Sequence, residues 1–192
     1  MELKRLFLED QMIERDDIVL RTVREEDGEA LFPMYSDESI YRFRPGFPRT
    51  TLPLVQKVIR RFRLSMEKQE LAAYTIVDPN DNGRIVGLVE VFHVDPRVEQ
   101  AEIGYTVTPA FQGRGIATAA VGCITDYLIL QLGFNRVYAS VHKDNANSMK
   151  VLCKNGFLSE GTVRQGEFWQ GIGFVDVCRF SKLLMDYGSA GK

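Results

Sequence analysis

Short runs in which β-branched and aromatic residues alternate with polar ones recur along this chain of 192 residues, and such runs predict β-strands. We expect strands over 18–23, 71–77, 84–94, 101–107 and 136–142. A hairpin should follow, with arms over about 157–169 and 174–184 and the glycine-rich turn 170–173 between them. The pattern therefore predicts a sheet of about seven strands.

Apolar residues at helical spacing predict helices between these strands. We expect one helix that ends near Tyr35, one that follows Thr51, a long one from Ile116 and a short one after Asn145. The long helix should turn one apolar face to the core, made of Ile116, Ala120, Cys123, Tyr127 and Leu130. A strand, a helix and a parallel strand in succession predict a right-handed crossover, so the fold class is mixed α/β.

The length of the chain suits one domain with a single core. Residues 1–17 are strongly charged and are expected to be an extension, partly helical, that lies loose or packs on a neighbouring subunit. Residues 18–185 are expected to form the domain, and 186–192 a frayed tail.

The composition of the chain bears on nucleic-acid binding, membrane insertion, secretion and metal binding. The net charge of −2 gives no sign of a general nucleic-acid binder, and no apolar run reaches the roughly 18 residues of a membrane span. The N-terminus lacks the apolar core of a signal peptide, so we expect a cytoplasmic protein. Cys123, Cys153 and Cys178 form no Cys-x-x-Cys pair and are expected to be buried free thiols. The two histidines show no metal spacing, so no metal is expected.

The segment 101–120, AEIGYTVTPAFQGRGIATAA, carries the clearest chemistry. Backbone N–H groups at the start of a helix have no partner within it, and the helix dipole adds partial positive charge there. A glycine-rich turn before a helix therefore suits a phosphate or pyrophosphate. The alternative is a tight turn that binds nothing. The Gly-x-Gly-x-x-Gly fingerprint of dinucleotide sites fails because Thr118 occupies its third glycine position, and no Gly-Lys-Ser/Thr occurs.

The run from Gln112 to Ala117 matches the acyl-CoA signature Gln/Arg-x-x-Gly-x-Gly/Ala, and it resembles the GNAT N-acetyltransferases. The longer phrase IGYTVTPAFQGRGIATAA resembles the RimJ/RimL branch, which contains ribosomal-protein N-terminal acetyltransferases. A second, independent motif combines Asn145-x-x-Ser148 with the run 154–157, Lys-Asn-Gly-Phe. The resemblance extends from about residue 18 to 184 and implies the GNAT fold, with a largely antiparallel sheet flanked by helices.

The resemblance also implies acetyl-CoA as the acetyl donor. It assigns the pyrophosphate to the turn and helix start, and the pantetheine arm to free backbone groups of the preceding strand. The cofactor-binding residues expected on this basis are Tyr105, Thr106, Val107, Gln112, Gly113, Arg114, Gly115, Ile116, Ala117, Thr118 and Asn145. Asn145 is also a plausible helix cap, and the two roles are compatible.

Two catalytic residues are expected. Glu167, before an aromatic residue as in this branch, is the candidate base for the amine proton, with Glu90 and Glu102 as rivals. Ser148 is the candidate acid for the thiolate that leaves, although many GNAT enzymes use a tyrosine there. The non-catalytic alternatives are that Glu167 is a surface glutamate and that Ser148 is a first-turn serine whose hydroxyl binds backbone groups.

The expected activity is transfer of an acetyl group to a primary amine by direct attack. The acceptor is a protein N-terminus or a small-molecule amine, and the irregular segment 41–47 is expected to help select it. A homodimer is compatible with this interpretation. The alternative is a CoA-binding regulatory or interaction module that has no turnover.

Overall fold

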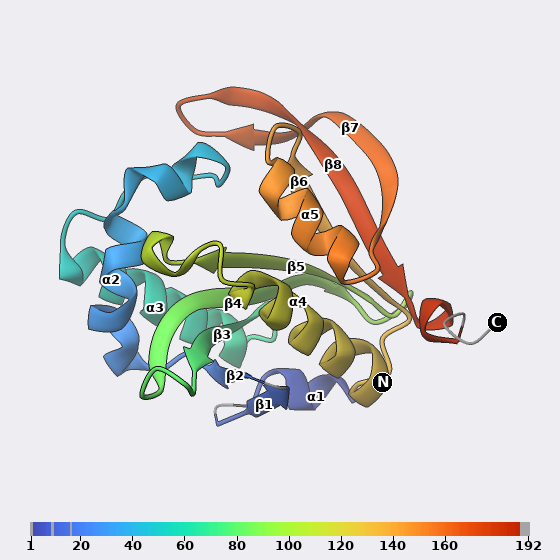
Figure 1. Ribbon diagram of the computed structural model, residues 1–192, viewed down its shortest axis with the longest axis horizontal. Coiled ribbons are helices and arrows are strands. Elements are labelled where there is room, and N and C mark those ends of the chain that lie inside the picture. Colours follow the sequence, from blue (N-terminus) through green and yellow to red (C-terminus); the bar gives the residue numbers. More distant parts are fainter. Residues whose placement is uncertain (1, 9, 16, 189–192) are drawn as a thin grey trace.

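A computed structural model describes residues 2–8, 10–15 and 17–188. It contains an eight-stranded sheet with strand order β1-β2-β3-β4-β5-β6-β8-β7 (Figure 1). The strands are β1 Met12–Arg15, β2 Ile18–Thr22, β3 Leu71–Asp78, β4 Arg84–Asp95, β5 Gln100–Val107, β6 Arg136–His142, β7 Leu158–Trp169 and β8 Gly173–Leu183. Among the strands of the described residues, only β5 and β6 pair in parallel. The mixed, largely antiparallel sheet is confirmed, with one strand more than expected.

Helices cover the sheet on both faces. They are α1 Leu3–Leu6, α2 Gly28–Ser36, α3 Leu52–Glu67, α4 Ile116–Asp126 and α5 Ala146–Lys154. The helices α4 and α5 share the larger apolar core with one face of the strands, whereas α2 and α3 pack over β3 and β4 on the opposite face. Beyond β4, this second face carries no long helix in the described part of the chain.

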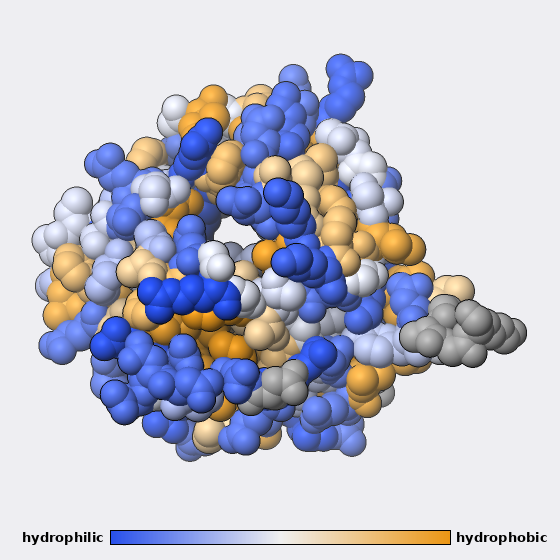
Figure 2. Space-filling model, in the orientation of Figure 1, coloured by the Kyte–Doolittle hydropathy of each residue, from blue (hydrophilic) through white to orange (hydrophobic). Residues whose placement is uncertain are grey.

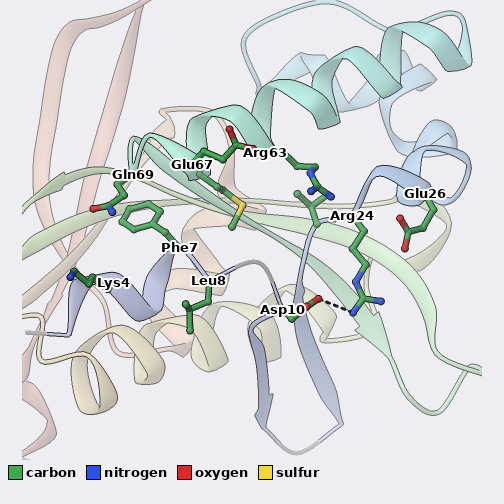
Figure 3. Close-up of a pocket in the computed structure, with 11 residues that line it drawn as sticks. Lys4, Phe7, Leu8, Asp10, Arg24, Glu26, Arg63, Glu67 and Gln69 are labelled. Carbon is green, nitrogen blue, oxygen red and sulfur yellow. Dashed lines mark hydrogen bonds and ion pairs between the residues drawn. The ribbon is translucent and has the colours of Figure 1, made fainter.

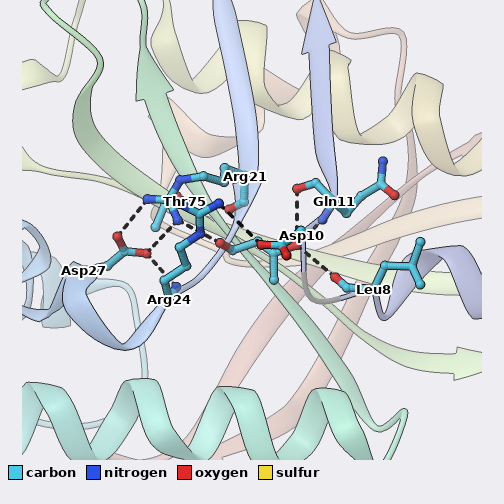
Figure 4. Close-up of polar contacts among 8 residues, drawn as sticks. Leu8, Asp10, Gln11, Arg21, Arg24, Asp27 and Thr75 are labelled. Carbon is cyan, nitrogen blue, oxygen red and sulfur yellow. Dashed lines mark hydrogen bonds and ion pairs between the residues drawn. The ribbon is translucent and has the colours of Figure 1, made fainter.

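The N-terminal segment is part of the folded body (Figure 4). Its strand β1 pairs with β2, and Leu6 is fully buried. The hydroxyl of Thr22 donates to the carbonyl oxygen of Leu8 at 3.1 Å and accepts from the N–H of Gln11 at 3.1 Å. Described residues of the expected extension thus add a strand to the sheet, because their apolar side chains cover the end of the core.

The apolar face of α4 follows the prediction as far as Tyr127 and then departs from it. Ile116, Ala120, Cys123 and Tyr127 are buried, but Leu130 is 55% exposed, so its predicted burial is wrong. The helix continues into a π-helical turn, Tyr127–Gln131, closed by the N–H of Leu132 on the carbonyl of Tyr127 at 3.0 Å. A π turn inserts one extra residue per turn and rotates the later side chains away from the core.

The structure differs from two further expectations, one about the cysteines and one about the C-terminal tail. Cys123 is buried and Cys178 half-buried, but Cys153 is exposed, because α5 buries only Leu152 fully. In the expected tail, the hydroxyl of Tyr187 binds the carboxylate of Asp126, while residues 189–192 lie outside the described part. No helix among the described residues is long and apolar enough to cross a membrane.

Candidate active site

The parallel strands β5 and β6 are hydrogen-bonded only at their first residues. Their register is Gln100↔Arg136, Ala101↔Val137 and Glu102↔Tyr138, and the pairing ends there. Both strands continue, so the backbone of 103–107 has β4 on one side and no strand on the other. Unpaired strand backbone is a template for a further extended chain. The sheet therefore opens in its middle and leaves hydrogen-bonding groups for an elongated ligand.

The opening leads to the glycine-rich turn before α4. Gly113 and Gly115 have φ values of +78° and +84°, and a Cβ at either position would meet nothing within 4 Å. Glycine is needed here for the left-handed backbone, and the space in front of the turn is open. The side-chain amide of Gln112 donates to the carbonyl of Val107 at 2.9 Å, so it ties the turn to the end of β5. Arg114 folds back to the carbonyl of Ala110 at 3.0 Å.

A groove of about 580 Å³ joins the opening, the turn and the first turns of α5. Except for Arg114 and Glu167, every predicted site residue lines this groove, including Asn145 and Ser148. Arg42, Arg44, Lys150 and Lys154 also line it, whereas its lining contains no Asp or Glu. In Figure 2 the background shows through the molecule near its centre, among hydrophilic side chains. The positive charge and the free backbone groups fit a long, anionic ligand.

Lys150 and Lys154 are site residues that sequence reasoning missed. They are four residues apart and share one side of α5, so their side chains reach the groove together. The spacing was visible in the sequence, but only the packing of α5 beside the turn shows that this side faces the groove.

Two hydroxyl groups meet where the groove passes α5. The phenol oxygen of Tyr105 lies 2.7 Å from Oγ of Ser148 and 3.1 Å from the Ser148 carbonyl. Oδ1 of Asn145 accepts from the N–H of Ser148 at 3.2 Å, so the predicted helix cap is confirmed. Burial raises the pKa of Tyr105, which keeps its phenol protonated at neutral pH. The pair can therefore pass or supply a proton.

Residues 17–158 match the family model described as an acetyltransferase (GNAT) domain. The chain belongs to the GNAT acetyltransferase family. It is 30% identical over 171 residues to an uncharacterized N-acetyltransferase, p20, of Bacillus licheniformis, a match that covers 88% of this chain and 94% of that protein. It is 31% identical over 90 residues to the spermidine N(1)-acetyltransferase of Escherichia coli strain K12, covering 47% of this chain and 48% of that protein.

Solved structures share the fold. A structure of RimL, a ribosomal L7/L12 α-N-protein acetyltransferase in complex with coenzyme A, superposes with a TM-score of 0.78 at 21% identity. The match covers 90% of this chain and 98% of that one. The resemblance to GNAT proteins, with RimL among the structural neighbours, is confirmed, and so is the classification of this chain as an acyltransferase.

On the opposite face of the GNAT sheet, both rival carboxylates have basic partners. Arg44 reaches down from the segment 41–47 and binds Glu90 at 3.0 Å and the hydroxyl of Thr106 at 3.1 Å. The side chains of Arg44 and Glu90 are 22% and 15% exposed, so the pair is largely withdrawn from water. Nδ1 of His93 lies 2.8 Å from Oε2 of Glu102.

Glu167 lies outside the groove. Its Oε2 accepts from Nε1 of Trp169 at 2.8 Å, and the buried Trp169 ring lies 5.1 Å from the ring of His142. The His142 ring in turn lies 5.6 Å from that of Phe43, a groove-lining residue. The structure thus separates the two predicted catalytic residues and connects Glu167 to the groove through an aromatic row. Phe43, His142 and Trp169 were not predicted, because they come from three distant segments.

A second hollow of about 500 Å³ lies between α1, the end of β2 and the end of α3 (Figure 3). Phe7, Val23 and Met66 supply apolar walls, while Arg24, Arg63, Glu26 and Glu67 bring charges of both signs. No serine, threonine, cysteine or histidine lines it, and the described residues contain no group of three or more metal-ligating side chains. The first groove therefore remains the candidate active site.

Proposed function

We propose that this GNAT protein transfers an acetyl group from acetyl-CoA to a primary amine by direct attack. The observation that carries the proposal is the parting of β5 and β6 after Glu102, directly beside a glycine turn at a helix start. The backbone of Tyr105–Val107 would hold the pantetheine amides, with Asn145 beside them. The N–H groups of Gly113–Thr118, with Lys150 and Lys154, would hold the phosphates, and Arg114 adds charge to the turn.

The amine must lose its proton before or during attack. We assign Glu167 as the base, acting through water, because it is the carboxylate near the aromatic row that has no cationic partner in the described residues. Deprotonation at pH 7 costs about 1.4 kcal/mol for a chain α-amine and about 4.6 kcal/mol for lysine. An α-amine therefore needs only a modest base. Glu90 and Glu102 remain the rivals, each already bound to a basic side chain.

The thiolate that leaves needs a proton. We assign Ser148 as its donor, with Tyr105 completing a relay through the 2.7 Å contact between their hydroxyl oxygens. The acetyl thioester supplies the electrophilic carbonyl; the chain supplies the proton relay and the backbone groups around it. The Tyr105 phenol, which burial keeps protonated, would return a proton to Ser148 after the transfer.

The acceptor is either a small amine or a protein N-terminus. The spermidine acetyltransferase acts on the first kind and RimL on the second.

We also propose a cytoplasmic location and a homodimer, which cell fractionation and light scattering would test.

The first experiment is thermal denaturation with and without acetyl-CoA. A ligand at about a hundred times its dissociation constant adds about 2.7 kcal/mol, a rise of several degrees for a domain of this size. A rise would justify screening amine acceptors for release of free thiol. No rise would refute the donor site. A rise without thiol release for any amine would favour the non-catalytic CoA-binding module.

A further inference from the structure

The strand register places one row of residues across the open part of the sheet, on the face opposite α4 and α5. Glu90 on β4 lies beside Gly104 on β5, and Ser140 on β6 lies beside Arg179 on β8. Ser140 is the next residue on this face after Tyr138, where the pairing of β5 with β6 ends. Arg179 therefore lies on the strand next to β6, on the side of the opening that faces away from β5.

Three carboxylates on this face are each matched by a basic side chain. Glu90 pairs with Arg44, Glu102 with His93, and Glu160 with Arg136 at 2.6 Å. Glu160 is further occupied by the hydroxyl of Ser181, which donates to it at 2.6 Å. Its two oxygens are thus both taken, one by Arg136 and one by Ser181.

Arg179 has no carboxylate partner among the described residues of this arrangement. It makes no side-chain hydrogen bond and no ion pair within the described part of the chain, and its buried Nε has no partner. Arg179 interacts with Glu160 only through long-range electrostatics. The guanidinium of Arg179 lies 5.2 Å from the centre of the Tyr138 ring, and that of Arg136 lies 4.5 Å from the same ring. Arg136 and Arg179 thus lie over the same ring, and only Arg136 of the two has a carboxylate partner in the described residues.

The structure leaves space for a ligand next to Arg179. Its neighbour on β7 is Gly161, which has a φ of +113°, and a Cβ there would meet nothing within 4 Å. A guanidinium is planar and donates in a fork that matches a carboxylate, and charge-assisted hydrogen bonds of this kind are among the strongest in proteins.

We propose that Arg179 binds a carboxylate of the acceptor, so that the preferred acceptors carry a carboxylate near the amine that is acetylated. The proposal rests on the proposed function and narrows its acceptor. A polyamine would bring more positive charge next to a guanidinium that has no carboxylate partner in the described residues. The carboxylate can belong to an acidic side chain early in a polypeptide or to the C-terminus of a short peptide, and both have the same chemistry.

The test compares initial rates of thiol release with matched acceptors. Ser-Glu amide and Ser-Gln amide differ only in a side-chain charge, and Ser-Gly and Ser-Gly amide differ only in a terminal charge. We expect kcat/KM to favour the charged member of at least one pair by about tenfold or more, mainly through KM. A preference in the first pair alone assigns the carboxylate to an acidic side chain, and in the second pair alone to a C-terminus. Equal rates within both pairs would overturn the proposal.

Variants show whether Arg179 carries the preference. In R179Q the preference should fall to about one, while R179K should retain part of it and R179E should favour Ser-Lys amide over Ser-Glu amide. Arg61→Gln removes the same charge from the exposed side of α3 and should leave the preference unchanged. An unchanged preference in a folded R179Q would refute the assignment. If R179Q fails to fold, the acceptor pairs measured on the wild-type protein still decide the proposal.

The two proposals fail in different ways. Thiol release that ignores the carboxylate contradicts the role of Arg179 and leaves the acetyltransferase assignment intact. Absence of any stabilisation by acetyl-CoA contradicts the assignment itself. Spermidine provides a third comparison, because better turnover of spermidine than of all four peptides would overturn the carboxylate preference.

Discussion

The two sides of the candidate site are built in different ways. The groove that we propose for the donor includes unpaired strand backbone, a glycine turn, a helix start and the capped α5, beside its basic side chains. The face that we propose for the acceptor carries charged side chains from distant segments, such as the pair Arg44–Glu90, 46 residues apart. Backbone geometry of this kind is encoded locally by short motifs, whereas the charge pairs exist only after the sheet has formed.

This difference has a functional reason. A donor that is always the same can be held by backbone groups, which tolerate changes of side chain. An acceptor differs between relatives, and charged side chains can be exchanged without disturbing the sheet. Variants should therefore fall into two groups, those that abolish donor binding and those that change the choice or the activation of the acceptor.

The largest effect should come from Gly115→Glu, which places bulk and negative charge in the open space before α4. We expect loss of measurable acetyl-CoA binding in calorimetry, while the protein remains folded. The positive φ of +84° adds backbone strain of about 1–2 kcal/mol for any side chain. Gly115→Ala is the matched control, because it has the same strain without the charge. Unchanged affinity in Gly115→Glu would refute the donor site.

Next in size is Glu167→Gln, which should lower kcat by about a hundredfold while the affinity for acetyl-CoA stays the same. The rate of the wild-type enzyme should rise with pH as the acceptor amine loses its proton. Glu102→Gln and Glu90→Gln are the companion variants, and acetyl-CoA affinity is measured for each. If Glu102→Gln loses more activity than Glu167→Gln, the base has been assigned to the wrong strand.

A smaller effect is expected for Arg44→Gln. Glu90, with a side chain only 15% exposed, would lose its ion-pair partner. An uncompensated carboxylate costs about 1–3 kcal/mol, so the melting temperature should fall by several degrees. The double variant Arg44→Gln/Glu90→Gln should be less destabilised than the sum of the two single variants. Strict additivity would mean that the pair contributes nothing.

The smallest effect concerns Glu160, whose side chain is 38% exposed. Burial opposes ionisation, but hydrogen bonds from Ser181 and Arg136 hold the pKa of this carboxyl below its usual value. A lowered pKa stabilises the fold above the unfolded value of about 4.3 and loses this contribution as pH falls through the folded value. Melting curves below about pH 5 should therefore decline less steeply for Glu160→Gln than for the wild-type protein. Identical slopes would contradict the pairing.

Most of the fold was predictable because each strand and helix carries its own periodicity. The departures have local causes. Leu130 fits the helical spacing of apolar residues in the sequence, but the π turn after Asp126 rotates its side chain outward. The strand β1 is short and charged, so its membership of the sheet depends on pairing with β2 rather than on its own residues.

The candidate site was predictable only in part, for a related reason. Gln112–Thr118, Asn145 and Ser148 lie in contiguous motifs whose chemistry follows from their spacing. The row Phe43–His142–Trp169, the unmatched Arg179 and the lysines of α5 carry no signal of their own, because a surface aromatic or cation looks the same in sequence whether or not it faces a groove.

The order of elements, the glycine turn and the family of this protein follow from the amino-acid sequence. These features depend on hydrogen bonds and dihedral preferences within a few residues. The point at which β5 and β6 part, the basic partner of each carboxylate and the guanidinium without a partner depend on the folded sheet. These features depend on distances between residues that are tens of positions apart, and such distances are defined only once the sheet register is formed.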